Sequence, residues 1–230
     1  MRVLAVSLAC LIGLVVGTLR SAAVAGNYDE WGHSNCVATN AQNANWSGRD
    51  LHAASIEYTD LRGANLQNIN LRSARLKCVD LRGADLRGAD LRGAELNGVD
   101  FADARLENAL FDGVRSMGIS LPGTTLRPVS DAQIRAIMSD CTGCNFGQAD
   151  LPGRNLTNIK LTGANFAEAN LRGADLRGAM FTGVNFSRAQ LAGVRLQDAA
   201  LVGCNFRGVD LSTVDLSSAR MTGDNFSNRL

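Results

Sequence analysis

The chain has few of the residues, and none of the short motifs, on which most enzymes depend. Its 230 residues include two histidines, His33 and His52, and neither has a second metal ligand or a catalytic partner at a useful spacing. The nucleophile elbow, the P-loop, the HExxH zinc motif and the EF-hand loop are all absent. We therefore expect no catalytic residue, no metal site and no cofactor, and we predict that the protein is not an enzyme.

Net charge of either sign is also lacking. Lysine and arginine number 23 and aspartate and glutamate 22, which gives a formal net charge of +1 at pH 7. A protein that binds nucleic acid usually carries a strongly basic surface, because the phosphate backbone dominates such binding. The balance predicts that this protein does not bind nucleic acid.

The chain has a long apolar run at its N-terminus. Val3 to Leu19 follows Arg2 and precedes a small-x-small cleavage motif, Ala23-Val24-Ala25. An uncleaved anchor is the alternative, but the run is shorter than the roughly 20 residues that span a bilayer. The pattern predicts a signal peptide at 1–25, no membrane span after its cleavage, and secretion to the periplasm or another part of a bacterial cell envelope.

The rest of the chain is dominated by a repeat of five residues. The stretch from Asp80 to Leu96 reads DLRGADLRGADLRGAEL, and large apolar residues recur at every fifth position from Trp46 to Phe111 and again from Phe146 to Phe226. A small residue usually stands two positions earlier. A period of five fits neither the 3.6 of a helix nor the 2.0 of a strand. Two inward and three outward residues per unit indicate a chain that turns a corner every five residues, which is a solenoid.

The repeated unit A-D-L-R-G resembles the A-(D/N)-L-x-x unit of the pentapeptide-repeat family, and about two thirds of the chain fits it. The resemblance implies an all-β fold, a right-handed quadrilateral β-helix with four units, or about 20 residues, in each coil. The repeat occurs here in two arms. The sequence is compatible with arms that stack into one rod and with arms that hinge between them.

We divide the chain into five parts. They are the signal peptide 1–25, an N-terminal cap at 26–43, a first arm at 44–116, an irregular break at 117–140 and a second arm at 141–230. Within the break, Ser130 and Gln133 have the spacing of a capping box and precede an apolar pattern. They predict a short helix at 131–139, and we expect this helix to cap the second arm.

Two arginines stand at inward positions where the repeat expects alanine. Arg49 and Arg154 occupy corresponding places near the start of the two arms. An unpaired buried guanidinium is too costly to keep. We predict that each side chain points outward through a loosened coil or pairs with a carboxylate near a cap.

Cysteine pairing leaves several alternatives. Cys141 and Cys144 form a C-x-x-C, which is typical of redox sites and of half zinc sites, but no second such motif and no βαβ context accompany it. The family resemblance implies a structural pair at the cap–coil junction, and after export this pair is expected to form a disulfide. Cys204 is predicted to be a core thiol and Cys78 the most exposed thiol, while the pairing of Cys36 and Cys78 stays open.

Residues 20 apart should stack on one outer face, about 4.8 Å from each other. Asp60, Asp80 and Asp100 then form an acidic column, with Arg62 and Arg82 in a basic column beside it. The family resemblance raises the alternative of a gyrase-binding DNA mimic. Such mimicry needs a run of uncompensated negative charge, and the interleaved arginines oppose it.

The second arm carries fewer charges. Its outward residues Met180, Ala200 and Val202, with Thr182, form a small apolar patch. We predict that this patch docks an unidentified protein partner or a second copy of the chain. The alternative is that this face binds nothing. The sequence thus predicts a non-enzymatic exported structural or protein-interaction module that displays rigid β-helix faces. The alternatives are the DNA mimic and a thiol-redox protein built on Cys141 and Cys144.

Overall fold

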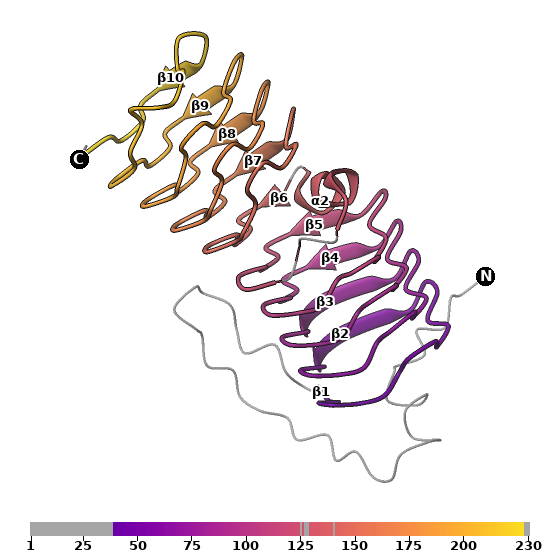
Figure 1. Cartoon of the computed structure of the whole chain (residues 1–230). Helices are drawn as coiled ribbons and strands as arrows, with labels where there is room; N and C mark the ends of the chain where they lie inside the picture. Colours follow the sequence, from indigo (N-terminus) through magenta and orange to yellow (C-terminus); the bar gives the residue numbers. More distant parts are fainter. Residues whose placement is uncertain (1–38, 125, 127–128, 140, 228–230) are drawn as a thin grey trace.

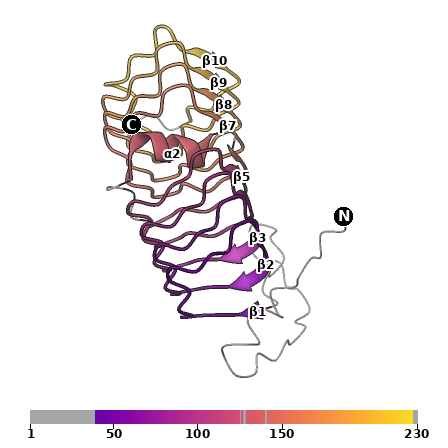
Figure 2. The same cartoon turned by 90° about the vertical axis from the view of Figure 1, so that its right-hand side faces the viewer.

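The computed structural model describes residues 39–124, 126, 129–139 and 141–227. The predicted signal peptide, most of the predicted N-terminal cap, His33 and Cys36 lie outside the described residues. The described chain forms a β-solenoid of about nine turns with one short helix, as Figures 1 and 2 show from two sides. The predicted right-handed quadrilateral β-helix is confirmed.

One wall of the solenoid is a parallel sheet of ten strands whose order follows the sequence. Strand neighbours in regular coils are 20 residues apart, as in the pairing of Leu161 with Phe181. The other walls are tight turns joined by single parallel bridges. The bounds are Thr39–Asn40 for β1, Ser55–Asp60 for β2, Arg75–Asp80 for β3, Glu95–Asn97 for β4, Arg115–Met117 for β5, Cys141–Thr142 for β6, Lys160–Thr162 for β7, Met180–Thr182 for β8, Ala200–Val202 for β9 and Arg220–Thr222 for β10.

The five-residue period produces the corners directly. The Ala64 amide donates to the Leu61 carbonyl at 3.0 Å and closes a turn, while the Leu61 amide donates to Asp80 of the next coil at 2.8 Å. Gly63 lies within this turn at a φ of 65°, a left-handed conformation that glycine adopts at little cost. Both inward residues, Leu61 and Ala64, are buried in a single core that runs through the stack.

The two arms stack into one continuous solenoid. Ser120 pairs with Asn145 and Met117 with Thr142, so the ladder crosses the predicted break. These partners are 25 residues apart, where partners in regular coils are 20 apart. We call residues 120–145 the splice coil, because it contains one extra five-residue unit.

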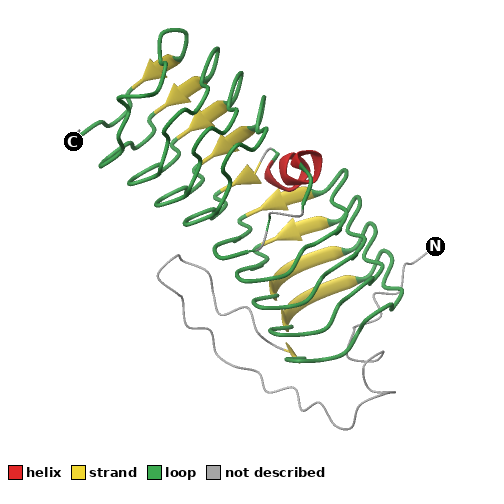
Figure 3. Ribbon diagram, in the orientation of Figure 1, coloured by secondary structure: helices red, strands yellow, loops and turns green. Residues whose placement is uncertain are grey.

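The extra length is taken up by α2 (Asp131–Met138), which ends one residue before the predicted end. The Ser130 side chain accepts a hydrogen bond from the Gln133 amide, as the capping-box spacing predicts. We had expected this helix to cap the second arm, but it does not close off that arm. It lies between the two arms (Figure 3) and buries Ile134, Ile137 and Met138.

Side chains of α2 replace part of the backbone ladder that a regular coil would supply. Gln133 accepts a hydrogen bond from the Phe111 amide below, and Asp131 accepts one from the Asn155 amide above at 3.1 Å. Arg135 donates to the Asn155 carbonyl at 2.8 Å. Backbone groups of both flanking coils are therefore satisfied by the helix, which explains why the stack continues across it.

The first coil begins earlier than we predicted. β1 pairs with Thr59 and Asp60 of β2, so the ladder is already formed at Thr39, inside the range expected to be a cap. Among the described residues, no helix has the length and apolar character needed to cross a membrane.

Candidate interaction surfaces

The acidic column of the first arm is neutralised within the fold. Arg62 donates from Nε and Nη2 to the two carboxylate oxygens of Asp60, at 3.0 and 2.7 Å, and lies 3.6 Å from Asp80 of the next coil. Arg82 binds Asp80 in the same way and lies 3.8 Å from Asp100. This wall offers no run of uncompensated negative charge, which argues against DNA mimicry.

The same Asp–Arg unit recurs at two other corners of the coil. Arg87 lies 2.6 Å from Asp85, and Arg92 lies 2.6 Å from Asp90. Hydrogen bonds from these arginines lower the pKa of both carboxyl groups. Asp100 differs: Ala102 takes the place of the arginine, and burial raises the pKa of the Asp100 carboxyl.

A more buried version of the unit occurs in the second arm. Asp175 is only 4% exposed and lies 2.8 Å from Arg177 and 2.9 Å from Arg195 of the next coil. The hydrogen bond from Arg177 lowers the pKa of the Asp175 carboxyl. Because its pKa is lower in the folded chain, Asp175 adds stability above its unfolded pKa of about 3.9, and this stability is lost as the pH falls through the folded pKa.

Replacing Asp175 by asparagine should therefore lower the free energy of unfolding more at neutral pH than at acidic pH. We expect Asp175→Asn to lower the free energy of unfolding by about 1–2 kcal/mol at pH 7, because both arginines lose a charged acceptor but remain half exposed to water. Urea titrations at pH 7 and pH 3 measure the effect, which should shrink at pH 3. Asp198→Asn, at an exposed carboxylate, is the control and should change little. An equal loss at both pH values would contradict this account.

The predicted apolar patch lies on the outer surface of the sheet. Met180 pairs with Ala200, and Thr182 with Val202, on the adjacent strands β8 and β9 (Figure 1). Met180 is 51% exposed and Val202 45% exposed. The register places Lys160 and Arg220 at its two ends, so the patch has an apolar centre between two cations.

Sequence reasoning missed Met117, which at 56% exposure is the most exposed large apolar residue among those described. It lies on the same sheet surface, because β5 pairs with β6 through Met117 and Thr142. The period-five phase could have revealed it, since it stands at the same outward place as Val202. The range around it was instead interpreted as a break.

The cysteines in the described part of the chain lie in three different environments. Cys141 and Cys144 form a disulfide with Cα atoms 5.9 Å apart, and they are 0% and 1% exposed. Cys204 is a free buried cysteine, and burial raises the pKa of its thiol to about 11. Cys78 is half buried and disulfide-bonded, so the prediction that it is the most exposed thiol is wrong.

This arrangement does not fit the thiol-redox alternative built on Cys141 and Cys144. Exchange catalysis needs an accessible sulfur that forms a thiolate easily. The Cys141–Cys144 disulfide is enclosed by the core, and the Cys204 thiol is held in its protonated form. His52 is exposed, and no group of three or more potential ligands in the described chain is placed to hold a metal ion.

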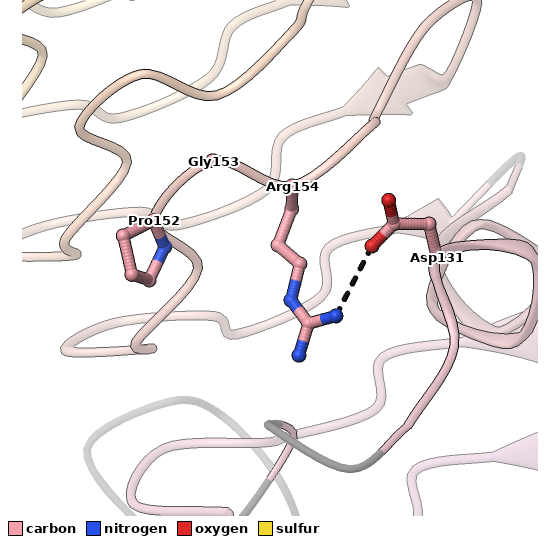
Figure 4. Close-up of a pocket in the computed structure, with 4 residues that line it drawn as sticks. All are labelled: Asp131, Pro152, Gly153 and Arg154. Atoms are coloured by element: carbon pink, nitrogen blue, oxygen red, sulfur yellow. Dashed lines mark hydrogen bonds and ion pairs between the residues drawn. The ribbon is translucent and has the colours of Figure 1, made fainter.

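An open hollow of about 360 Å³ lies where α2 meets the second arm, lined by Asp131, Pro152, Gly153 and Arg154 (Figure 4). Arg154 points toward the helix and lies 3.1 Å from Asp131. It also donates to the carbonyls of Leu126 and Val129, at 2.7 and 3.1 Å. Arg154 thus pairs with a carboxylate of the helix, one of the two predicted outcomes, and its guanidinium serves the fold.

Comparison with known proteins supports the repeat. The family described as Pentapeptide repeats matches in eight copies, over residues 34–72, 74–113, 139–178, 159–198 and 189–228. A search of curated proteins found no match.

Solved structures with similarity include HetL, a pentapeptide repeat protein involved in heterocyst differentiation regulation from the cyanobacterium Nostoc sp. strain PCC 7120. It is 29% identical over 81% of this chain and 84% of that chain, with a TM-score of 0.43. Full-length QnrB1, a plasmid-mediated fluoroquinolone resistance protein, is 20% identical over 78% of this chain and 80% of that chain, with a TM-score of 0.28. A pentapeptide repeat protein from the Arabidopsis thaliana thylakoid lumen is 19% identical over 69% of each chain, with a TM-score of 0.23.

Proposed function

Because the chain belongs to the pentapeptide-repeat family, we propose that it is an exported, non-enzymatic module whose rigid outer faces bind a protein partner in the bacterial cell envelope. The backbone ladder and the continuous core fix the backbone from which the outward side chains of the described coils project. Binding through such a preformed surface loses little conformational entropy.

The observation that carries this proposal is the exposure of Met180 and Val202 on adjacent strands. The two side chains stand on a sheet that cannot collapse around them, so a docking partner would remove apolar surface from water. Lys160 and Arg220 at the ends of the patch favour a partner with an apolar centre and acidic groups around it.

The double variant Met180→Glu/Val202→Glu tests the surface. It places two carboxylates in the centre of the patch, and we expect at least a tenfold loss of any bound envelope protein, because unpaired charges would be buried in the contact. The measurement is affinity capture from the envelope fraction with the full chain tagged at its C-terminus, with light scattering to detect self-association.

Ala192→Glu/Ser212→Glu is the matched control. It adds the same charge to exposed positions of the same arm but on another wall, and it should keep the partner. A Met180→Glu/Val202→Glu chain that folds normally and still retains every partner would refute the assigned surface.

The proposal that the chain is exported rests on the N-terminal sequence pattern, and a separate experiment tests it. We expect the chain expressed in a bacterial host to appear in the periplasmic fraction with a new N-terminus close to Gly26. Full-length chain found only in the cytoplasm would refute export without bearing on the docking surface.

A further inference from the structure

β6 lies at the joint between the two arms. Among the described residues it contains Cys141 and Thr142, and it pairs with β5 through Met117 and Thr142 and with β7 through both of its residues. A change in the backbone at β6 therefore acts directly on the contact between the arms.

The Cys141–Cys144 disulfide encloses this joint. Thr142 lies between the two cysteines, and its carbonyl accepts the Gly118 amide at 2.9 Å. Just beyond the disulfide, Asn145 donates to Ile119 at 2.8 Å and accepts from Leu121 at 2.9 Å. Closing a short loop by a disulfide reduces the conformations open to its backbone, so it holds these ladder groups in place.

The helix α2 also connects the two arms, through side chains. Gln133 binds the first arm, and Asp131 and Arg135 bind Asn155 of the second. Side-chain contacts of this kind have more conformational freedom than a backbone ladder. Loosening of residues 141–145 would make the connection between the arms depend more on these contacts.

The disulfide lies within the buried core. Cys141 occupies the inward place that Leu161 and Phe181 fill in the following coils, and the buried helix residues Ile137 and Met138 belong to the same cluster. Two thiols need more space than a disulfide, because sulfur atoms that are not bonded stand farther apart than bonded ones. Reduction would therefore change the packing of this part of the core.

We propose that the Cys141–Cys144 disulfide is a redox-sensitive lock that holds the two arms together as one rigid body. A dithiol reductant supplies two electrons and two protons, the sulfur–sulfur bond breaks to give two thiols, and the reductant becomes a disulfide. Because both sulfurs are buried, the reductant reaches them only when the splice coil opens. The lock does not depend on which partner the Met180–Val202 surface binds.

Hydrogen exchange followed by mass spectrometry tests the lock. In Cys141→Ser/Cys144→Ser we expect amide exchange at 118–121, 131–138 and 141–145 to be at least tenfold faster than in the oxidised chain, while residues 81–100 and 165–200 keep their rates. Wild-type chain treated with dithiothreitol should show the same pattern in these segments. At high dithiothreitol concentration the rate of reduction should level off, because opening of the splice coil limits it.

Cys204→Ser is the matched control, since Cys204 stands at the same inward corner as Cys144, three coils further along, and is a free cysteine. It should leave exchange in the splice coil unchanged. Unchanged exchange at 118–121 and 141–145 in both the double variant and the reduced wild type would overturn the proposal. A uniform acceleration across all coils would also overturn it, because the disulfide would then be a general stabiliser.

Discussion

Phe186→Ala is expected to lower the free energy of unfolding by about 3–5 kcal/mol. Phe186 is buried and stacks between Phe166 and Phe206, with ring centroids 5.5 and 5.1 Å away. Phe181 meets it edge to face at 5.3 Å. Truncation would remove three aromatic contacts and leave a cavity, and the ladder bonds above and below prevent the coils from closing it.

Phe226→Ala provides the comparison within the same stack. Phe226 continues the ladder beyond Phe206 at 5.3 Å, but it is only partly buried. We expect a loss below about 2 kcal/mol, because much of the side chain already contacts water. Urea unfolding followed by circular dichroism measures both variants, and equal losses would show that the ladder does not act as described.

Arg154→Met is expected to lower the free energy of unfolding by about 2–4 kcal/mol. The guanidinium donates to the carbonyls of Leu126 and Val129 and to Asp131. Methionine has a similar stem but no donor, so these acceptors would lose their partner. The segment before α2 would then lose its contacts first, and amide hydrogen exchange should become faster at Val129 to Met138.

Arg172→Met is the control for this second variant. Arg172 lies on the next coil at an exposed position, so its loss should change the free energy of unfolding by less than about 0.5 kcal/mol. The same urea titration gives both values. A loss at Arg154 no larger than that at Arg172 would mean that the guanidinium does not hold the splice coil.

The repeat made most of the fold predictable, because the residues of each five-residue unit determine the turn that this unit forms. Leu61 and Ala64 face inward for reasons contained in five residues, and the same holds for the outward positions of Met180 and Val202. The Ser130–Gln133 spacing likewise predicted the start of α2. Local features of this kind can be predicted from the sequence alone.

The joint between the arms could not be predicted in the same way. That Gln133 and Asp131 accept from the amides of Phe111 and Asn155 depends on how distant segments meet, and side-chain type alone does not reveal it. Cys78 was misjudged for a related reason. Its outward position is visible in the sequence, but its disulfide is not.

The five-residue phase survives the helix. Leu121, Leu126 and Cys141 are all buried at the same place in the repeat, within the splice coil and on either side of α2. A whole unit could therefore be added or removed there while inward residues stay inward, whereas other lengths would turn the core of the second arm toward water. The splice coil is a natural crossover point at which recombination could exchange one arm for another of the same family and preserve the surface of each.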